Sequence, residues 1–251
     1  MTEKETVRIA AVADIHVKKT SQGAFQPLFA KVTEEADVLL LCGDLTDYGL
    51  VEEAKILAKE ISTSLRIPAI GVLGNHDVES DHADEIVKIL TDAGVVMLDG
   101  DSHEVHGVGF AGVKGFGGGF GRRQLGAWGE KIIKAFVHEA IEEALKLEAA
   151  LARLRTPQKI AVLHYAPIAA TAVPEPAEIM PFLGSSRLED PIDRYRCSAV
   201  FHGHAHRGSL EGRTKSNVPV YNVAMPLLLA AYPDRLPFRV VQVPVNEAVV
   251  A

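Results

Sequence analysis

Short apolar runs that alternate with amphipathic segments are the feature that most constrains the fold of this chain. In the first half, runs rich in β-branched and aliphatic residues are separated by segments with helical periodicity. The apolar runs cover 7–13, 37–42 and 67–73, and the helical segments cover 22–35, 50–64 and 82–93. This order is typical of βαβ units, in which helices cover a largely parallel sheet whose strands are buried on both faces.

The second half continues the pattern around one long helix. Short strands are predicted within 95–113, and a glycine-rich stretch then precedes a helix predicted over 126–155. Further strands are predicted at 159–164, 198–203, 218–223 and 238–243, with 224–251 as a closing strand and tail. Because no repeat or linker composition divides the chain, we expect a single domain over 1–251. Segments 114–123 and 165–190 are long loops of the kind that form lids.

Composition excludes several classes of protein. The 251 residues are 47% hydrophobic and 24% charged, which supports a packed core and argues against disorder. A formal charge of −7 argues against general nucleic-acid binding. The N-terminus does not have the pattern of a signal peptide, and no apolar run is long enough for a membrane span. With Cys42 and Cys197 among apolar neighbours, we expect reduced, buried thiols and a cytoplasmic protein.

Polar clusters follow five of the predicted strands. The clusters are "ADIH" at 13–16, "GDLTD" at 43–47, "GNHD" at 74–77, a single histidine at 164 and "GHAH" at 203–206. Strand ends on one edge of an α/β sheet converge, so these side chains should meet. The candidate ligands are Asp14, His16, Asp44, Asn75, His164, His204 and His206. Seven donors exceed one tetrahedral site but suit two ions that share a carboxylate, and mixed imidazole and carboxylate donors favour Mn, Fe or Zn over Ca or Mg.

Each cluster alone has a simpler interpretation as a turn or a helix cap, but the ordered set is specific. The blocks D-x-H, G-D-x-x-D, G-N-H-D, H and G-H-x-H, from Asp14 to His206, resemble the signature of the calcineurin-like metallophosphoesterases. The resemblance implies a four-layer α/β/β/α sandwich with a dimetal centre at the sheet edge. It also implies one metal held by Asp14, His16, Asp44 and His206, and another held by Asp44, Asn75, His164 and His204, with Asp44 bridging.

The implied activity is hydrolysis of a phosphate ester by attack of a metal-bridging hydroxide. Two divalent ions beside two carboxylates would leave the site at about +2, which attracts a small phosphorylated substrate to a negatively charged protein. His76 follows the ligand Asn75 and is the candidate proton donor to the leaving group. By resemblance to the phosphatases of the family, Asp47 pairs with His76 and favours its imidazolium form. His202 alternates with His204 and is expected to face the core.

Three further positions have two interpretations each. Arg122 and Arg123 follow the glycine-rich loop, where they could bind the substrate phosphate or simply begin a solvated helix. Trp128 is expected to lie in the core or to pack on the helix, with stacking on a base as the alternative. Asp77 is expected to be a turn or capping residue, with a supporting role beside the ligands as the alternative.

Among substrates, a phosphodiester such as a cyclic nucleotide or a small nucleotide-like compound is favoured. A phosphomonoester is the alternative, because His76 would serve either reaction. The chain has no basic stripe, which disfavours a nuclease, and the complete ligand set with His76 disfavours a non-catalytic metal-binding scaffold. Nothing in the sequence indicates an oligomeric state.

Overall fold

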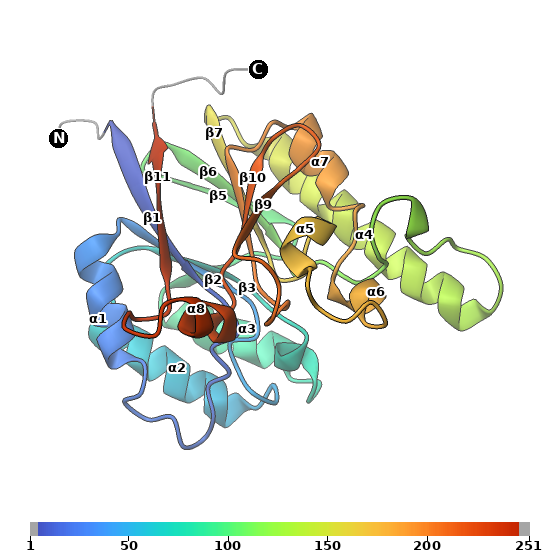
Figure 1. The fold of residues 1–251 in the computed structure, drawn as a ribbon. Coiled ribbons are helices and arrows are strands. Elements are labelled where there is room, and N and C mark those ends of the chain that lie inside the picture. The colour runs from blue at the N-terminus through green and yellow to red at the C-terminus, as the bar shows by residue number, and fades with distance from the viewer. Residues whose placement is uncertain (1–4, 246–251) are drawn as a thin grey trace.

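Two β-sheets stack face to face in the computed structural model, which describes residues 5–245 (Figure 1). The first sheet has the order β11-β1-β2-β3-β4, in which β1 to β4 are parallel and β11 is antiparallel to β1. Its strands are β1 (Thr6–Val12), β2 (Val38–Cys42), β3 (Ala69–Val72), β4 (Val95–Met97) and β11 (Arg239–Pro244).

The second sheet has the order β5-β6-β7-β8-β10-β9, with a parallel centre from β6 to β10 and an antiparallel strand at each edge. Its strands are β5 (Asp101–Val105), β6 (Val108–Val113), β7 (Gln158–Leu163), β8 (Ala199–His202), β9 (Glu211–Arg213) and β10 (Pro219–Asn222). Because the strands in both centres are parallel, their C-terminal ends lie along one edge of each sheet.

Helices form the two outer layers (Figure 1). The first sheet is covered by α1 (Gln26–Glu35), α2 (Val51–Ser64) and α3 (Ala83–Asp92), and the second by α4 (Lys131–Arg153) and α7 (Glu189–Arg194). Three shorter helices are α5 (Ala169–Ala172), α6 (Met180–Leu183) and α8 (Met225–Ala231), and 3-10 turns occur at His76–Val78 and Gly121–Arg123. The predicted four-layer α/β/β/α sandwich is confirmed.

Alternate residues of the central strands enter different cores. In β1, Ile9 and Ala11 pack between the sheets, whereas Ala10 and Val12 face α1 and α2. Fully buried Phe110 and Phe201 reach the inter-sheet core from the second sheet. Burial on both faces explains why these strands read as nearly continuous apolar runs.

Several predicted boundaries were wrong for identifiable reasons. The long helix begins at Lys131 rather than 126, because Gly129 has a left-handed backbone (φ +80°) that a helix does not accommodate. The segment 165–190, predicted as a loop, contains α5, α6 and the start of α7. The predicted closing strand is present as β11, but α8 precedes it, and the end of the predicted tail lies outside the described residues.

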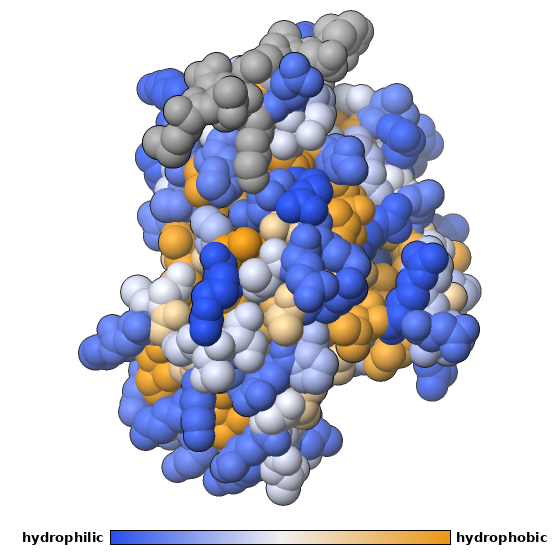
Figure 2. Space-filling model, turned by 90° about the vertical axis from the view of Figure 1, so that its left-hand side faces the viewer, coloured by the Kyte–Doolittle hydropathy of each residue, from blue (hydrophilic) through white to orange (hydrophobic). Residues whose placement is uncertain are grey.

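The face bearing α1 and the β1–β11 edge of the first sheet is mixed in character. Figure 2 shows small hydrophobic patches there, separated by hydrophilic residues. Among residues 5–245, none of the helices combines the length and apolar composition that crossing a bilayer requires.

Candidate metal centre

The predicted metal ligands and His76 meet at one end of the two sheets. They lie in the loops that leave the C-terminal ends of β1, β2, β3, β7 and β8, where the stacked sheets bring five chain segments together. The cluster comprises Asp14 and His16, Asp44, Asn75 and His76, His164, and His204 and His206. Four of these residues, Asp14, His16, Asp44 and His204, have a left-handed backbone, with φ of 56°, 43°, 49° and 67°.

Asp14 is fully buried and connects the two sheets. Its carboxylate accepts hydrogen bonds from the backbone N–H of His204 (3.0 and 3.1 Å), and its Oδ1 lies 2.9 Å from His206 Nε2. The backbone of Gly203 lies against this carboxylate: a Cβ there would be 2.3 Å from Asp14 Oδ2. The absence of a side chain at Gly203 therefore allows this close approach. The contact raises the pKa of His206, chiefly through the hydrogen bond to Asp14.

Asp44 is buried at the centre of the cluster. Its Oδ1 accepts a hydrogen bond from the backbone N–H of His76 (2.8 Å) and lies 3.4 Å from His164 Nε2, while Oδ2 lies 3.9 Å from His16 Nε2. Burial alone would raise the pKa of Asp44, but the charge and hydrogen bond of His164 outweigh burial and lower it. The residue is therefore a carboxylate with histidines on opposite sides.

His164 is oriented by the strand beside it. Its Nδ1 is 3.0 Å from the carbonyl of Cys42, so it donates there and leaves Nε2 facing Asn75 Oδ1 (3.0 Å) and Asp44. Burial lowers the pKa of His164, but the nearby carboxylate of Asp44 reverses this effect and raises the pKa to about 9. In the absence of a metal, Nε2 of His164 therefore carries a proton that lies between the oxygen atoms of Asn75 and Asp44. Without this proton, a nitrogen lone pair would face both oxygen atoms.

The donor set fits two metal ions. Among the residues that the structure describes, three groups of side chains have possible ligand atoms within 4.8 Å of one another: Asp14, His16 and His206; Asp44, His164 and His204; and His16, Asp44 and His76. His204 Nε2 lies 3.1 Å from the carbonyl of Phe182, which leaves its Nδ1 free to ligate. Burial lowers the pKa of His16 and, to about 4, that of His204, which favours their neutral, ligating forms.

Asp47 and His76 contact each other, but not as predicted. His76 Nδ1 lies 2.8 Å from the backbone carbonyl of Asp47, and the nearest carboxylate is that of Glu79, at 3.4 Å. The Asp47 carboxylate turns towards His16 Nδ1 (3.5 Å) and Lys18 (3.7 Å) instead. The predicted ion pair is therefore replaced by a backbone contact, because the Asp47 N–H bonds to Val17 and fixes the residue beside the loop after β1.

Two polar residues beside the ligands hold the loops in place. Fully buried Asp77 accepts hydrogen bonds from the backbone N–H groups of Leu45, Thr46 and Gly74 and from the Thr46 hydroxyl, so it joins the loops after β2 and β3. Of the two interpretations of Asp77, the structure therefore favours the second, a supporting role beside the candidate ligands. His202 faces away from the cluster, as predicted, and contacts the Thr171 hydroxyl (2.8 Å), while burial lowers its pKa to about 4.

The glycine-rich segment and the segment 165–190 pack against each other. Gly118 and Gly119 donate backbone hydrogen bonds to Pro181 (2.6 Å) and Gly184 (2.8 Å), and Gly119 pairs with Ser185 in a short β-bridge. Arg122 and Arg123 follow this contact and are exposed. Trp128 is 74% exposed, so the expectation that it lies in the core or packs on the helix was wrong.

Sequence reasoning missed three contributors to the site. The Tyr165 ring packs on His204, with 4.4 Å between ring centroids, and the Phe182 carbonyl accepts the hydrogen bond described above. Buried Asn222 donates to the carbonyl of Ala205 (2.8 Å) and so holds the last ligand loop. Of the three, only Asn222 could have been identified from the sequence, because it is an amide at the end of an apolar strand. The Phe182 contact is made by the backbone, so no residue type in the sequence indicates it.

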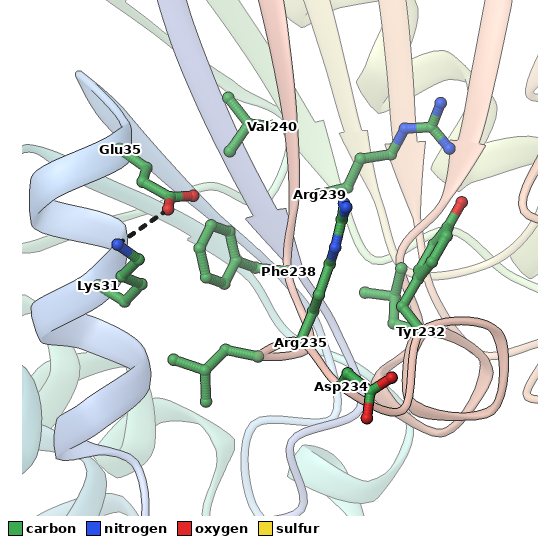
Figure 3. A pocket seen from close by; sticks show the side chains of 10 residues that line it. Lys31, Glu35, Tyr232, Asp234, Arg235, Phe238, Arg239 and Val240 are labelled. Carbon is green, nitrogen blue, oxygen red and sulfur yellow. Dashed lines mark ion pairs between the residues drawn. The ribbon is translucent and has the colours of Figure 1, made fainter.

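A groove of about 620 Å³ lies outside this cluster (Figure 3). It is formed by α1, the start of β11 and the turn between α8 and β11, and Lys31, Tyr232, Arg235 and Phe238 are among its lining residues. None of the residues that line it belongs to the histidine and carboxylate cluster. The candidate active site is therefore the histidine and carboxylate cluster rather than this groove.

The fold and the cluster together define a metallophosphoesterase. The sequence profile of the calcineurin-like phosphoesterases matches residues 7–208, and the chain belongs to that family. It is accordingly a metal-dependent phosphoesterase, and the family implies two divalent ions at the cluster.

Solved structures show the same fold. The crystal structure of a phosphopantetheinyl hydrolase from Mycobacterium tuberculosis superposes with a TM-score of 0.68 at 14% sequence identity, covering 97% of each chain. The structure of TT1561 from Thermus thermophilus gives a TM-score of 0.51 at 15% identity, covering 96% of this chain and 100% of that one. A comparison with curated protein sequences gave no significant match. At these identities the structural likeness establishes the fold alone.

Proposed function

We propose that this protein hydrolyses small phosphodiesters, such as cyclic nucleotides or nucleotide-like compounds, at a centre of two transition-metal ions. The observation that carries the proposal is the position of Asp44 between two groups of donors. Asp14, His16 and His206 would hold one ion and Asn75, His164 and His204 the other, with Asp44 shared. Imidazole and carboxylate donors favour Mn, Fe or Zn at both positions.

When bound, the ions supply Lewis acidity towards the phosphoryl oxygens and towards the attacking water. The protein holds the donors in place before substrate arrives. Asp14 and Asp44 are fixed by backbone N–H groups, and His164 is fixed by the Cys42 carbonyl, so little reorganisation is needed during the reaction.

His76 is positioned to protonate the leaving oxygen. It lies at the rim of the cluster, its ring packs edge-on against His16 (4.7 Å between centroids), and its side chain is 36% exposed. Nδ1 faces the Asp47 carbonyl and the Glu79 carboxylate, so it acts as a donor to them. The proton given to a departing alkoxide would then be the one on Nε2 of the imidazolium form, which leaves a neutral ring protonated at Nδ1. An alkoxide needs this proton more than a good leaving group does.

The charge beside His76 supports a diester rather than a monoester. Glu79 places a carboxylate beside His76, on the proposed side of the leaving group. A diester carries one negative charge at neutral pH and a monoester close to two, so repulsion from this carboxylate opposes the monoester more strongly. The two segments 114–123 and 165–190, which are joined by backbone hydrogen bonds, would form one wall of the substrate site, and Arg122 and Arg123 would belong to that wall.

The first test is hydrolysis of bis(p-nitrophenyl) phosphate and p-nitrophenyl phosphate by chelator-treated protein, before and after addition of Mn²⁺. We expect metal-dependent activity with a higher kcat/KM for the diester. A preference for the monoester would contradict the diester assignment, and full activity after complete metal removal would contradict the metal-dependent mechanism.

Two variants test the roles of single residues. Asp44→Asn should lose both ions, measured by metal analysis of the purified protein, because both groups of donors use this carboxylate. His76→Asn should keep both ions and lose roughly 10²–10⁴-fold in turnover of a diester with an alkoxide leaving group, the usual contribution of a proton donor. His138→Asn, at an exposed histidine of α4, is the control. Retention of two ions by Asp44→Asn, or of full turnover by His76→Asn, would remove that residue from its proposed role.

A further inference from the structure

We propose that residues 122–134, which include the first turn of α4 and are here called the α4 tip, form a binding surface for an anionic lipid bilayer. The proposal concerns how the protein is placed in the cell and is independent of the diester assignment. It rests on three observations: exposed apolar side chains, unpaired positive charges, and continuity of this surface with the metal centre.

Large apolar side chains are exposed at the α4 tip. Trp128 and Ile132 are each 74% exposed and Ile133 is 39% exposed, whereas the inward face of α4 is fully buried from Val137 onwards. Figure 1 shows that this end of α4 projects beyond the sheet that the rest of the helix covers. A tryptophan and two isoleucines brought together on a projecting element are unusual for a surface that meets only water.

Positive charge surrounds these apolar residues. Arg122, Arg123, Lys131 and Lys134 are all exposed, and Glu130 is the acidic residue among them. Within the described part of the chain these four cations form no ion pair, whereas Lys146, farther along α4, pairs with Asp99 and Glu143. The cations therefore stand out in a protein of formal charge −7. A local basic surface of this kind is attracted to anionic lipids.

The surface continues towards the metal centre. The ring of Phe136, in α4, lies 6.0 Å from that of Phe182, which is itself 58% exposed. The backbone carbonyl of Phe182 contacts His204 of the metal centre. Val173 and Ile179 add exposed apolar area on the same segment of chain. A bilayer at the α4 tip would therefore lie close to the entrance of the site.

The composition fits a lipid surface better than nucleic acid. Tryptophan prefers the membrane interface, isoleucine partitions into the acyl region, and lysine and arginine reach the headgroup phosphates. A nucleic-acid surface would also use the cations, but protein–DNA interfaces are polar and give an exposed pair of isoleucines no role. The observations thus favour peripheral attachment to a membrane containing phosphatidylglycerol or a similar lipid.

Trp128 is the chain's sole tryptophan, so its fluorescence reports on this surface directly. The full-length protein is titrated with vesicles of phosphatidylcholine alone and with vesicles containing about 30% phosphatidylglycerol. We expect a blue shift of the emission maximum and co-sedimentation with the anionic vesicles only. A double-stranded oligonucleotide is the comparison probe. The absence of a shift and of co-sedimentation, or a shift with the oligonucleotide alone, would overturn the proposal.

Paired variants separate the two parts of the surface. Lys131→Gln with Lys134→Gln should weaken partitioning by roughly thirtyfold, as expected for two interfacial cations, whereas Lys55→Gln with Lys59→Gln on α2 should leave it unchanged. Ile132→Ser should abolish the blue shift, while Leu145→Ser, at a 51% exposed position later in α4, should not. Equal effects of a tip variant and its control would show that the α4 tip does not mediate binding.

Discussion

Backbone strain is concentrated at the candidate metal ligands. Among residues 5–245, eight non-glycine residues have a left-handed backbone, and half of them belong to the candidate metal centre: Asp14, His16, Asp44 and His204. Each such residue costs of order 1 kcal/mol or more, so the surrounding structure must hold it in place. Here the hydrogen bonds from His204 and His76 to the two carboxylates do so. The strain turns consecutive polar side chains towards one point.

Asp77 is expected to be a stabilising residue whose loss also weakens metal binding. Asp77→Asn replaces one acceptor oxygen by an amide that faces backbone N–H groups, and should lower the free energy of unfolding by about 2–4 kcal/mol. Denaturant unfolding and metal titration would measure both effects. The control is Asp84→Asn, at an exposed position in α3. Equal stability of the two variants would show that the hydrogen bonds of Asp77 do not stabilise the two loops.

Cys197 should make stability fall at alkaline pH. Burial raises the pKa of its thiol from 9.0 to about 12, so the folded state keeps the proton after the unfolded state has lost it. The contribution of this thiol to the free energy of unfolding is fully present below about pH 9. Above that pH the free energy of unfolding falls by up to about 1.4 kcal/mol per pH unit. Cys197→Ala should show a shallower decline in urea unfolding between pH 9 and 10.5. Identical pH profiles would contradict this assignment.

At the scale of elements, the strand ends and the glycines after them place the ligands. Gly203→Ala should disrupt the contact between β8 and the loop after β1, since the new Cβ would lie 2.3 Å from Asp14 Oδ2. We expect loss of bound metal, with a fall in stability, measured by metal analysis and thermal unfolding. Gly94→Ala, which changes a left-handed glycine with open space around it, should keep its metal. Normal metal content in the Gly203 variant would contradict the requirement for close approach.

The sequence predicted the central elements because their signals are physical requirements of burial. A strand that is buried on both faces, such as β2, appears in the sequence as a continuous apolar run. The apolar residues of α2 recur at helical spacing, which fits a helix better than a strand. The α4 start was missed because Gly129 interrupts a helix that the periodicity alone continues. Helix α8 was missed because its seven residues give little helical periodicity, although Pro226 lies in its first turn, where proline is common.

The residues of the candidate site whose side chains follow strand ends could be predicted individually from the sequence. What could not be predicted are contacts made by the backbone. The Asp47 carbonyl, rather than its carboxylate, faces His76, and the Phe182 carbonyl faces His204. Such contacts depend on where the loops lie in three dimensions, and any residue type could supply them.

At the scale of the whole molecule, the core between the sheets should carry much of the stability. Phe110 is fully buried there, and Phe110→Ala should lower the free energy of unfolding by about 3–5 kcal/mol, because it removes apolar contacts and leaves a cavity. Phe182→Ala, at a 58% exposed phenylalanine, should change it by about 0.5 kcal/mol or less. Denaturant unfolding of both variants tests this difference; similar losses would place the main core elsewhere.

The pairing of β1 with β11 has a consequence for synthesis of the protein on the ribosome. The first strand of the chain pairs with the last one described, across more than two hundred residues of sequence, and Ala13 also bridges Ala224. The nascent chain can therefore form β1 to β4 and their helices early, but one side of β1 has no partner until β11 has been synthesised. Until then, that strand offers open hydrogen-bonding groups to other nascent chains and to chaperones.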